Sequence, residues 1–550
     1  MRFVLVLALL IVALPAQKVF HTYTQWAPTT LDPQLVNHAA YLRYHAQLFE
    51  SPLEMGFGER GHCDIRPGIC FKPIISEDGL TITLRVQQGI RFHPDACFKD
   101  GKGRQVTAAD LRYMFMRHAD PSHPSVYWES FLAGRITGLD AWRRRAQDHG
   151  VADYDAKLAG LIAEKDVFRL RLTAPYPTLI SLLTQPWASI VPSEAVRRYG
   201  TGFGTAHPIG TGPFRFKSKD ALGTVVLVKN TDYRMQGWPH IDEVRFEVVD
   251  DLDKRTTRFL NGDLHVLDVW ANNADRLLNR FGLIQTALRR KGIRYTYSPP
   301  LEVSYFYFNL KNKILAKKGV REAFAYAIDR RALAKIVDGP GYQLANSPLP
   351  RVFPESAPVD AKPYLYDKRS PGRARKCLKD AGFPEGKGLP EFVFDCPGEL
   401  AEKDRRAMAL VKANLAEIGI KVQLREEKDF NAYMKRVGEG DVQIGWTRWY
   451  ADYPDAENFL ILFRSHESPT GTFNYGMYKN PEYDQLYDKM SKLYPGPERT
   501  EIITKMVDLI RHDVPWVFLY YPRHGMLVQK GVFGFRNNVL NYSLRDVQLR

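Results

Sequence analysis

The amino-acid sequence predicts an α/β protein built from at least two lobes. Its 550 residues exceed the roughly 250–300 that one hydrophobic core usually organises. Segments that alternate apolar and polar residues are interleaved with segments whose apolar residues recur every three or four positions, which predicts strands alternating with helices. The apolar fraction of 45% and the charged fraction of 25% are typical of folded globular proteins.

The first residues predict an export signal. A basic start at Met1–Arg2 precedes the apolar run Phe3–Leu14, and Ala16 supplies a small residue for cleavage. The run is too short to span a bilayer of about 30 Å, and no later segment reaches the roughly 18 apolar residues that a spanning helix needs. We therefore expect residues 1–16 to be a cleaved signal peptide and the mature chain to be soluble and periplasmic. The first cysteine is Cys63, so no lipid-attachment cysteine follows the leader.

Two features of composition concern partners and redox state. The net charge of +15 raises nucleic acid or an anionic membrane as partners, but the best basic cluster, Arg143–Arg145, is soon followed by Asp148 and predicts a solvated helix face. We expect no nucleic-acid partner. In an exported chain the cysteines permit up to two disulfides. A bridge between Cys63 and Cys70 and two free thiols remain alternatives, and Cys97, Cys377 and Cys396 have no assigned partner.

The predicted elements of the first half follow from periodicity and turn residues. The segment at 208–213, which contains Gly-Thr-Gly-Pro, is dense in turn-forming residues and is expected to be a rigid turn, since its glycines tolerate positive φ. In order, the predicted elements are a strand over 22–26, a helix over 39–50, a strand over 80–86 and a helix from 107 to 120 that begins with an N-cap Thr107.

In the second half a predicted strand leads into an aromatic loop. Apolar residues predict a helical face from 320 that ends near 338, and a helix over 407–418 closed by Gly419. Strands are predicted at 420–424 and at 442–446, and the latter runs into Thr447–Asp455. Ligands of open α/β sheets bind beyond the carboxyl ends of strands. This loop is therefore the predicted binding segment.

Short motifs along nearly the whole chain resemble one known family. They are Leu31–Pro33, Leu48–Glu50, Asp78–Arg85, Gly89–His93, Val106–Asp110, Ile209–Phe214, Phe306–Asn309, Val320–Arg330, Ala381–Phe383, Ile418–Val422 and Ala451–Asp455. In this order they resemble the family 5 extracellular solute-binding proteins of ABC importers, the oligopeptide- and dipeptide-binding protein family.

The resemblance implies a bilobal periplasmic-binding-protein fold, of the class with an extra subdomain, whose lobes are joined by hinge crossovers. The chain departs from the family pattern in two places. One is Arg60–Lys72, which carries two cysteines, and the other is the loop before Thr107. The expected parts are lobe I at 17–60, 185–269 and 516–550, the extra subdomain at 61–184, and lobe II at 270–515.

The resemblance also implies a function and a binding site. The protein would capture oligopeptides or peptide-like solutes by closure of the lobes and deliver them to the membrane permease and its ATPases, as a monomer. A metal complex, haem, a sugar or an opine is the alternative cargo. Asp452 matches the aspartate that grips the peptide ammonium in relatives. The other candidate binding residues are Trp449, Trp446, Tyr450, Tyr305, Tyr307, Trp26 and Arg448.

Enzymatic and metal-binding readings have little support in the sequence. There is no Gly-x-Ser-x-Gly elbow, His-Glu-x-x-His motif or Gly-rich phosphate loop, so we expect no enzyme and no catalytic residue. His93, Asp95 and Cys97, or the pair His118 and His123, could be invoked as metal ligands, but neither set has a regular ligand spacing. We therefore expect no metal site and no cofactor.

Overall fold

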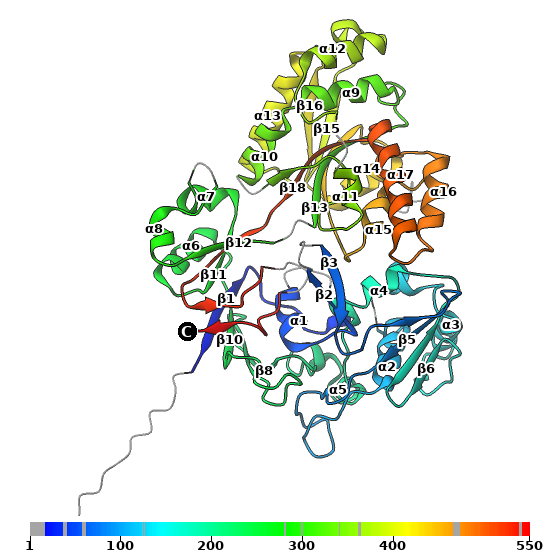
Figure 1. Cartoon of the computed structure of the whole chain (residues 1–550), viewed down its shortest axis with the longest axis vertical. Helices are drawn as coiled ribbons and strands as arrows, with labels where there is room; N and C mark the ends of the chain where they lie inside the picture. Colours follow the sequence, from blue (N-terminus) through cyan, green and yellow to red (C-terminus); the bar gives the residue numbers. More distant parts are fainter. Residues whose placement is uncertain are drawn as a thin grey trace, which may run out of the picture.

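The computed structural model shows two lobes and a subdomain (Figure 1). It describes residues 17–36, 41–57, 62–123, 125, 127–279, 282–298, 301–339, 342–360, 365–465, 473–537 and 542–550. The predicted leader at 1–16 lies outside these residues. Within them, every helix is too short or too polar to cross a membrane.

Lobe I, the lower lobe in Figure 1, is built on two small sheets and carries the C-terminus. One sheet has the order β1-β10-β9-β8 with β1 and β10 parallel, and the other has the order β11-β19-β12. The strands are β1 (Val19–Thr24), β8 (Phe214–Lys219), β9 (Val225–Lys229), β10 (Glu243–Val248), β11 (Val266–Val269), β12 (Arg294–Tyr297), β19 (Gly525–Val528), β20 (Val532–Phe533) and β21 (Gln548–Leu549). The helices are η1 (Pro33–Leu35), α1 (Leu42–Leu48), α5 (Ser193–Tyr199), η5 (Gly200–Gly204), α6 (Leu252–Asn261), α7 (Ala271–Leu277) and α8 (Thr286–Arg290).

The subdomain packs against lobe I and shares its hydrophobic core. Its sheet has the order β4-β5-β7-β6. The strands are β4 (Ile74–Ile75), β5 (Thr81–Arg85), β6 (Leu161–Glu164) and β7 (Val167–Arg171). The helices are α2 (Ala108–Ala119), the π-helical turn η3 (Trp128–Leu132), α3 (Leu139–His149), α4 (Thr178–Leu182) and η4 (Pro186–Ala188). One continuous core fixes the subdomain to lobe I.

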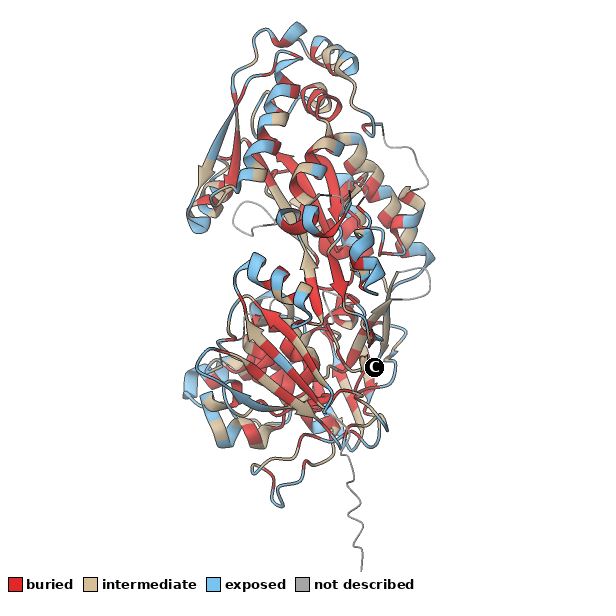
Figure 2. Cartoon of the chain, turned by 90° about the vertical axis from the view of Figure 1, so that its left-hand side faces the viewer, coloured by how far each residue is buried: buried red, intermediate tan, exposed pale blue. Residues whose placement is uncertain are grey.

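Lobe II is a six-stranded sheet covered by helices, and its central strands are largely buried (Figure 2). The strand order is β14-β18-β13-β17-β15-β16. The strands are β13 (Glu302–Phe308), β14 (Tyr342–Leu344), β15 (Phe392–Pro397), β16 (Val422–Glu427), β17 (Ile444–Tyr450) and β18 (Trp516–Pro522). The helices are α9 (Lys318–Ala327), α10 (Arg330–Asp338), α11 (Ser356–Asp360), α12 (Pro371–Asp380), η6 (Pro384–Gly386), α13 (Glu402–Ala416), α14 (Phe430–Glu439), α15 (Glu457–Leu460), η7 (Ile461–Phe463), α16 (Pro481–Met490) and α17 (Pro497–Asp513).

Two chain crossovers join the lobes. The chain passes from β12 in lobe I to β13 in lobe II, and returns from β18 in lobe II to β19 in lobe I. Our expected limits of lobe II, 270 and 515, therefore differ from the structure: α7, α8 and β12 lie in lobe I, and β18 lies in lobe II. Apolar alternation identifies a strand but carries no information on which sheet it joins.

A hairpin after α1 makes a third contact between the lobes. It consists of β2 (Leu53–Phe57) and β3 (Cys63–Pro67). Met55 is 2% exposed and belongs to the core of lobe II, and the Cys63 amide donates a 2.7 Å hydrogen bond to the Val352 carbonyl. We refer to this segment as the β2–β3 hairpin.

All five cysteines are free. Of the two alternatives for Cys63 and Cys70, the disulfide is therefore wrong. Cys63 packs against the core of lobe II, whereas Cys70 is buried in the core of lobe I. The extended strand between them carries the two side chains into different cores.

Most predicted elements are confirmed, with two corrections. The helix expected from 320 to 338 is two helices, α9 and α10, because Asp329 accepts a hydrogen bond from the Ala332 amide and starts a new helix. Gly210 and Gly212 do not adopt positive φ. A Cβ at either position would lie 2.1 or 2.3 Å from a backbone oxygen of α1, so these glycines permit close packing.

Candidate functional site

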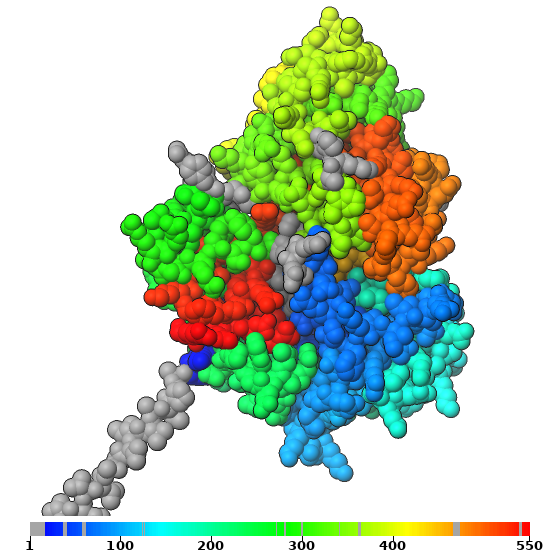
Figure 3. Space-filling view, in the orientation of Figure 1, coloured from blue at the N-terminus to red at the C-terminus, as the bar shows by residue number. Residues whose placement is uncertain are grey.

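A cavity of about 790 Å³ lies between the subdomain and lobe II. Pockets for small ligands usually have volumes of about 300–1,000 Å³. One wall comes from segments around 127–135 and 174–187, and the other comes from 449–464, 473 and 487–492. The two parts meet at the edge of the cavity, where Tyr494 of lobe II donates a 3.4 Å hydrogen bond to the Gly79 carbonyl, and their surfaces are in contact in Figure 3.

The subdomain wall is an aromatic stack. Tyr127 lies 5.2 Å from Trp187 at an interplanar angle of 19°, and Phe131 lies 6.1 Å from Trp187 at 7°. The Tyr127 hydroxyl donates to the Val36 carbonyl, so the phenol is fixed. Phe131 also contacts Tyr453 of lobe II edge to face, at 5.8 Å. This wall offers flat apolar surfaces to a ligand.

The facing wall contains three of the predicted binding residues. Trp449, Tyr450 and Asp452 line the cavity at and beyond the end of β17. Asn458 holds this segment: its Oδ1 accepts from the Trp449 indole and from the Asp452 amide, both at 3.0 Å, and its Nδ2 lies 3.3 Å from Asp452 Oδ2. One amide side chain thus orients both an indole and a carboxylate.

Asp452 presents a carboxylate to the cavity without a cationic partner. Its side chain is accessible from the cavity, yet the surrounding protein replaces much of the water. Burial raises the pKa of Asp452 above its usual value, and the hydrogen bond from Asn458 offsets this only in part. No ion pair to Asp452 is present among the residues that the structure describes. Such a group favours a cation that enters the cavity.

The two acidic residues that follow Asp452 in the chain are already engaged within the protein. Asp455 is buried and pairs with Arg499, which also pairs with Glu355 at 3.0 Å. Glu457 accepts hydrogen bonds from the hydroxyls of Tyr453 and Tyr487. These contacts hold the loop after β17 in place.

Three predicted binding residues lie in the core of lobe II. Every residue of β13 is buried, because the strand is paired on both sides and covered on both faces. Tyr305 stacks on Trp516 at 3.4 Å, and the Tyr307 hydroxyl bonds that of Tyr433 at 2.9 Å. The Trp446 indole donates to Ser304 Oγ at 3.3 Å. Packing, not ligand contact, explains these side chains.

The other two predicted residues are also absent from the cavity wall. Trp26 is 52% exposed on lobe I, beyond the end of β1. Arg448 points toward the crossovers, where its guanidinium lies 3.2 Å from Asp338 and 3.4 Å from Glu302 and donates to the Tyr520 hydroxyl at 2.9 Å.

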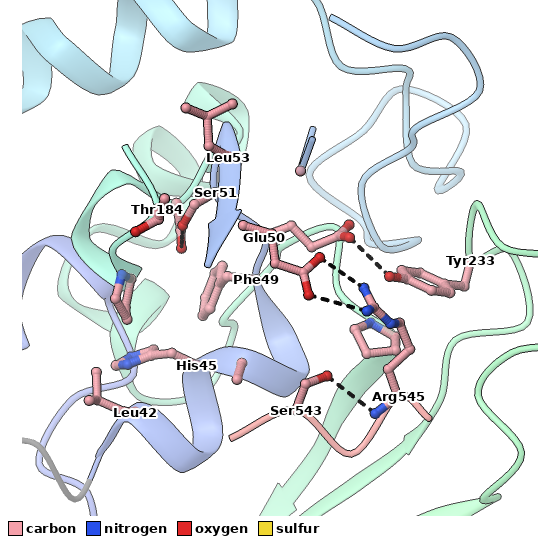
Figure 4. A pocket seen from close by; sticks show the side chains of 16 residues that line it. Leu42, His45, Phe49, Glu50, Ser51, Leu53, Thr184, Tyr233, Ser543 and Arg545 are labelled. Atoms are coloured by element: carbon pink, nitrogen blue, oxygen red, sulfur yellow. Dashed lines mark hydrogen bonds and ion pairs between the residues drawn. The ribbon is translucent and has the colours of Figure 1, made fainter. Parts of the chain in front are cut away.

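A second cavity, of about 70 Å³, lies where lobe I meets the subdomain (Figure 4). Its charged residues neutralise one another: Arg545 pairs with both oxygens of Glu54 at 3.2 Å, and Glu50 accepts from Tyr233 at 2.9 Å and from Arg234 at 3.0 Å. None of the predicted binding residues lines it.

Two of the three histidines considered as metal ligands, His93 and His118, make side-chain hydrogen bonds within the fold. His93 is buried and contacts the Gly212 carbonyl and the Gly210 amide, and His118 contacts Ser125 Oγ and the Trp187 carbonyl. Across the described part of the chain, no three His, Cys, Asp or Glu side chains are grouped so as to hold a metal ion.

Several cavity residues carry no local signal in the sequence. Tyr127, Phe131, Trp187 and Asn458 come from separate segments that only the fold brings together. The aromatic-rich stretch at 127–131 is the one sequence feature that could have indicated part of the cavity wall.

The fold is that of a two-lobed binding protein, and its larger described cavity lies between the subdomain and lobe II. The sequence profile of the bacterial extracellular solute-binding proteins, family 5 (middle region), matches residues 64–470. The chain belongs to this family.

Known relatives share the fold over nearly the whole chain. The glutathione-binding protein GsiB of Pectobacterium atrosepticum is 25% identical over 466 residues, which are 84% of this chain and 81% of that protein. The structure of HbpA2 from Haemophilus parasuis superposes with a TM-score of 0.80 at 22% identity, covering 97% of this chain and 100% of the other. The ABC transporter-associated periplasmic binding protein DppA from Helicobacter pylori, in complex with the peptide STSA, has a TM-score of 0.71 at 22% identity, covering 96% and 98%.

Proposed function

We propose that this protein is the solute-binding subunit of an ABC importer and that it captures short peptides by closure of its lobes. The observation that carries the proposal is the carboxylate of Asp452, which faces the cavity without a cationic partner among the described residues. The names of a glutathione-binding relative and of a peptide-bound structural neighbour support a peptide cargo.

The cavity walls would recognise a peptide in two ways, by a charged group and by apolar surfaces. Asp452 binds the α-ammonium group of the peptide, with its orientation set by Asn458. Trp449 and the stack of Tyr127, Phe131 and Trp187 accept side chains of varied shape. Binding across two parts of the molecule favours the closed arrangement, since only that arrangement satisfies both walls.

The remaining parts of the proposal concern export and partners. The segment up to Ala16 is removed on export, which N-terminal sequencing of the exported protein tests. The closed monomer delivers its cargo to the permease and its ATPases. Binding requires no covalent step, so the proposed role is not catalytic.

The first prediction concerns Asp452→Asn. Removing one member of a buried ion pair costs about 3–5 kcal/mol, and each 1.4 kcal/mol is tenfold in affinity. Because the Asp452 carboxylate is accessible from the cavity, we expect a loss near the low end of this range, about 100-fold. Calorimetry with Ala-Ala-Ala, free or N-acetylated, measures it.

Acetylation of the peptide removes the ammonium group, which is the other member of the same ion pair. The losses of affinity caused by acetylation and by Asp452→Asn should therefore not add. The matched control is Asp148→Asn, because Asp148 is exposed on α3 outside the cavity. If the wild type binds free and acetylated peptide equally tightly, Asp452 is not the ammonium site.

A further inference from the structure

The cavity wall carries six ionisable acidic and basic side chains, and only some of them are paired. They are Arg135, Asp452, Glu457, Arg464, Asp488 and Lys492. Arg464 and Asp488 form an ion pair at 2.9 Å, so their charges neutralise each other. Glu457 accepts from two tyrosine hydroxyls, and burial raises its pKa. The charges left to face a ligand are one carboxylate, Asp452, and two cations.

Neither of these cations makes an ion pair with a described residue. The Arg135 guanidinium lies 4.6 Å from the centre of the Tyr176 ring. Stacking occupies one face of the guanidinium and leaves its edge, which carries the N–H donors, available to a carboxylate. Lys492 follows α16, and both its side chain and that of Arg135 are exposed at the cavity.

The segments that carry the two cations meet at one edge of the cavity. A Cβ at Gly79 would lie 3.3 Å from Pro175 and 3.5 Å from Tyr494. Pro175 precedes Tyr176, on which Arg135 stacks, and Lys492 lies two residues before Tyr494. The pKa of Asp452 is raised, with neither cation among the groups that lower it. Among the described residues, neither cation forms an ion pair with Asp452.

We propose that the preferred cargo is a short acidic peptide, with one ammonium group and two carboxylates. The inference rests on the proposed function and deepens it. Asp452 receives the ammonium group, and Arg135 and Lys492 receive the C-terminal carboxylate and one side-chain or second terminal carboxylate. A neutral peptide leaves one cation in the cavity wall without a partner, so it binds less tightly.

The experiment compares Ala-Glu-Ala with Ala-Gln-Ala, two peptides of equal size that differ in one charge. Calorimetry on the wild type should show about tenfold tighter binding of Ala-Glu-Ala, as a partly buried ion pair contributes about 1.4 kcal/mol. Arg135→Gln and Lys492→Gln should each reduce this preference. Lys492→Glu should reverse it in favour of Ala-Gln-Ala. Arg145→Gln is the matched control, because Arg145 is exposed on α3 away from the cavity.

The outcomes separate this inference from the proposed function. Equal affinity of the wild type for both peptides overturns the acidic preference and leaves peptide capture intact. A preference that survives in Arg135→Gln, Lys492→Gln and Lys492→Glu overturns the assignment to these two cations. No binding of either peptide, or of Ala-Ala-Ala, overturns peptide capture itself, and the acidic preference with it.

Discussion

At the scale of single residues, Asn458 determines the geometry of the candidate site. Its side chain is buried and joins the Trp449 indole, the Asp452 amide and the Asp452 carboxylate. The sequence around Asp452 indicated the aromatic residues and the carboxylate, but it gave no reason to select Asn458. A hydrogen-bonding role of this kind depends on the turn between 452 and 458, which is a property of the folded loop.

We predict that Asn458→Ala weakens peptide binding and moves its pH dependence. Without the Nδ2 donor, the pKa of Asp452 should rise further, since burial then acts unopposed. Affinity for an ammonium group requires the ionised carboxylate, so it should fall on acidification at a higher pH than in the wild type. The released indole donor should also cost about 1–3 kcal/mol of stability.

Calorimetry with Ala-Ala-Ala over a series of pH values, together with urea unfolding, checks both effects. An unchanged pH profile in Asn458→Ala would show that Asn458 does not influence the Asp452 carboxylate.

The residues that sequence reasoning misplaced have a common cause. Tyr305 and Tyr307 alternate with Phe306 and Phe308 as in a strand with one polar face, yet both faces of β13 are buried. A tyrosine fits either a cavity or a core because its ring is apolar and its hydroxyl needs only one partner. Tyr307 finds that partner in Tyr433, from α14. Only the packing of α14 on the sheet could have shown this.

At the scale of elements, the two crossovers are linked by an ion pair between β13 and the segment before β19. His524 Nε2 lies 3.3 Å from Glu302 Oε2. Burial disfavours the imidazolium, but the hydrogen bond and the charge of Glu302 outweigh it and raise the pKa of His524. Asp268 and Asp338 act in the same direction, and Arg448 lies on the far oxygen of Glu302.

This pair predicts a pH-dependent stability. A histidine whose folded pKa is raised stabilises fully below its unfolded value of about 6.5, and the stabilisation is lost as pH rises through the folded pKa. His524→Gln should therefore lower the free energy of unfolding by about 1 kcal/mol near pH 6 and by less near pH 9. Urea unfolding at both pH values measures the difference.

Glu302 sets the lower limit of the pH range in which the His524–Glu302 pair stabilises the protein. Burial opposes its charge, but His524 and Arg448 together lower the pKa of Glu302, so its contribution is present above about pH 4.3 and is lost on further acidification. Glu302→Gln also breaks the contact with Arg448, so the pairing with His524 is measured by a double-mutant cycle at pH 6, in which the losses of His524→Gln and Glu302→Gln should sum to more than the loss of the double variant. A pH-independent difference between wild type and His524→Gln would contradict the pairing.

Helices and strands were largely predictable from local pattern, whereas their assembly was not. The Thr107–Asp110 capping box starts α2 as expected, and Gly419 ends its helix with φ of +83°. The assignment of β18 to lobe II depended on its pairing with β13 and β14, which are more than 150 residues away. Such pairings are fixed by long-range packing and leave no local trace.

At the scale of the whole molecule, peptide binding should couple closure to stability. A ligand at 100 times its Kd adds about 2.7 kcal/mol to the folded state when it does not bind the unfolded chain. We expect a higher melting temperature and a smaller radius of gyration with Ala-Glu-Ala than without it. Thermal unfolding and small-angle scattering test this. Asp452→Asn under the same peptide concentration is the control, and an identical response in that variant would contradict specific capture.

The contacts between the lobes are unequal at opposite ends of the interface. At the β2–β3 hairpin, separation would expose Met55 and break the bond from Cys63 to Val352. At the other end the described contacts include a 3.4 Å hydrogen bond from Tyr494 to the Gly79 carbonyl, a 3.5 Å bond from Ser181 to the Pro454 carbonyl and the packing of Tyr453 on Phe131. Because the two chain crossovers tether the lobes covalently away from Tyr494, we expect the lobes to separate first at Tyr494 and last at the hairpin. Under the proposed acidic preference, a solute would then enter past Lys492 and Arg135, whose positive charges would favour an anionic solute.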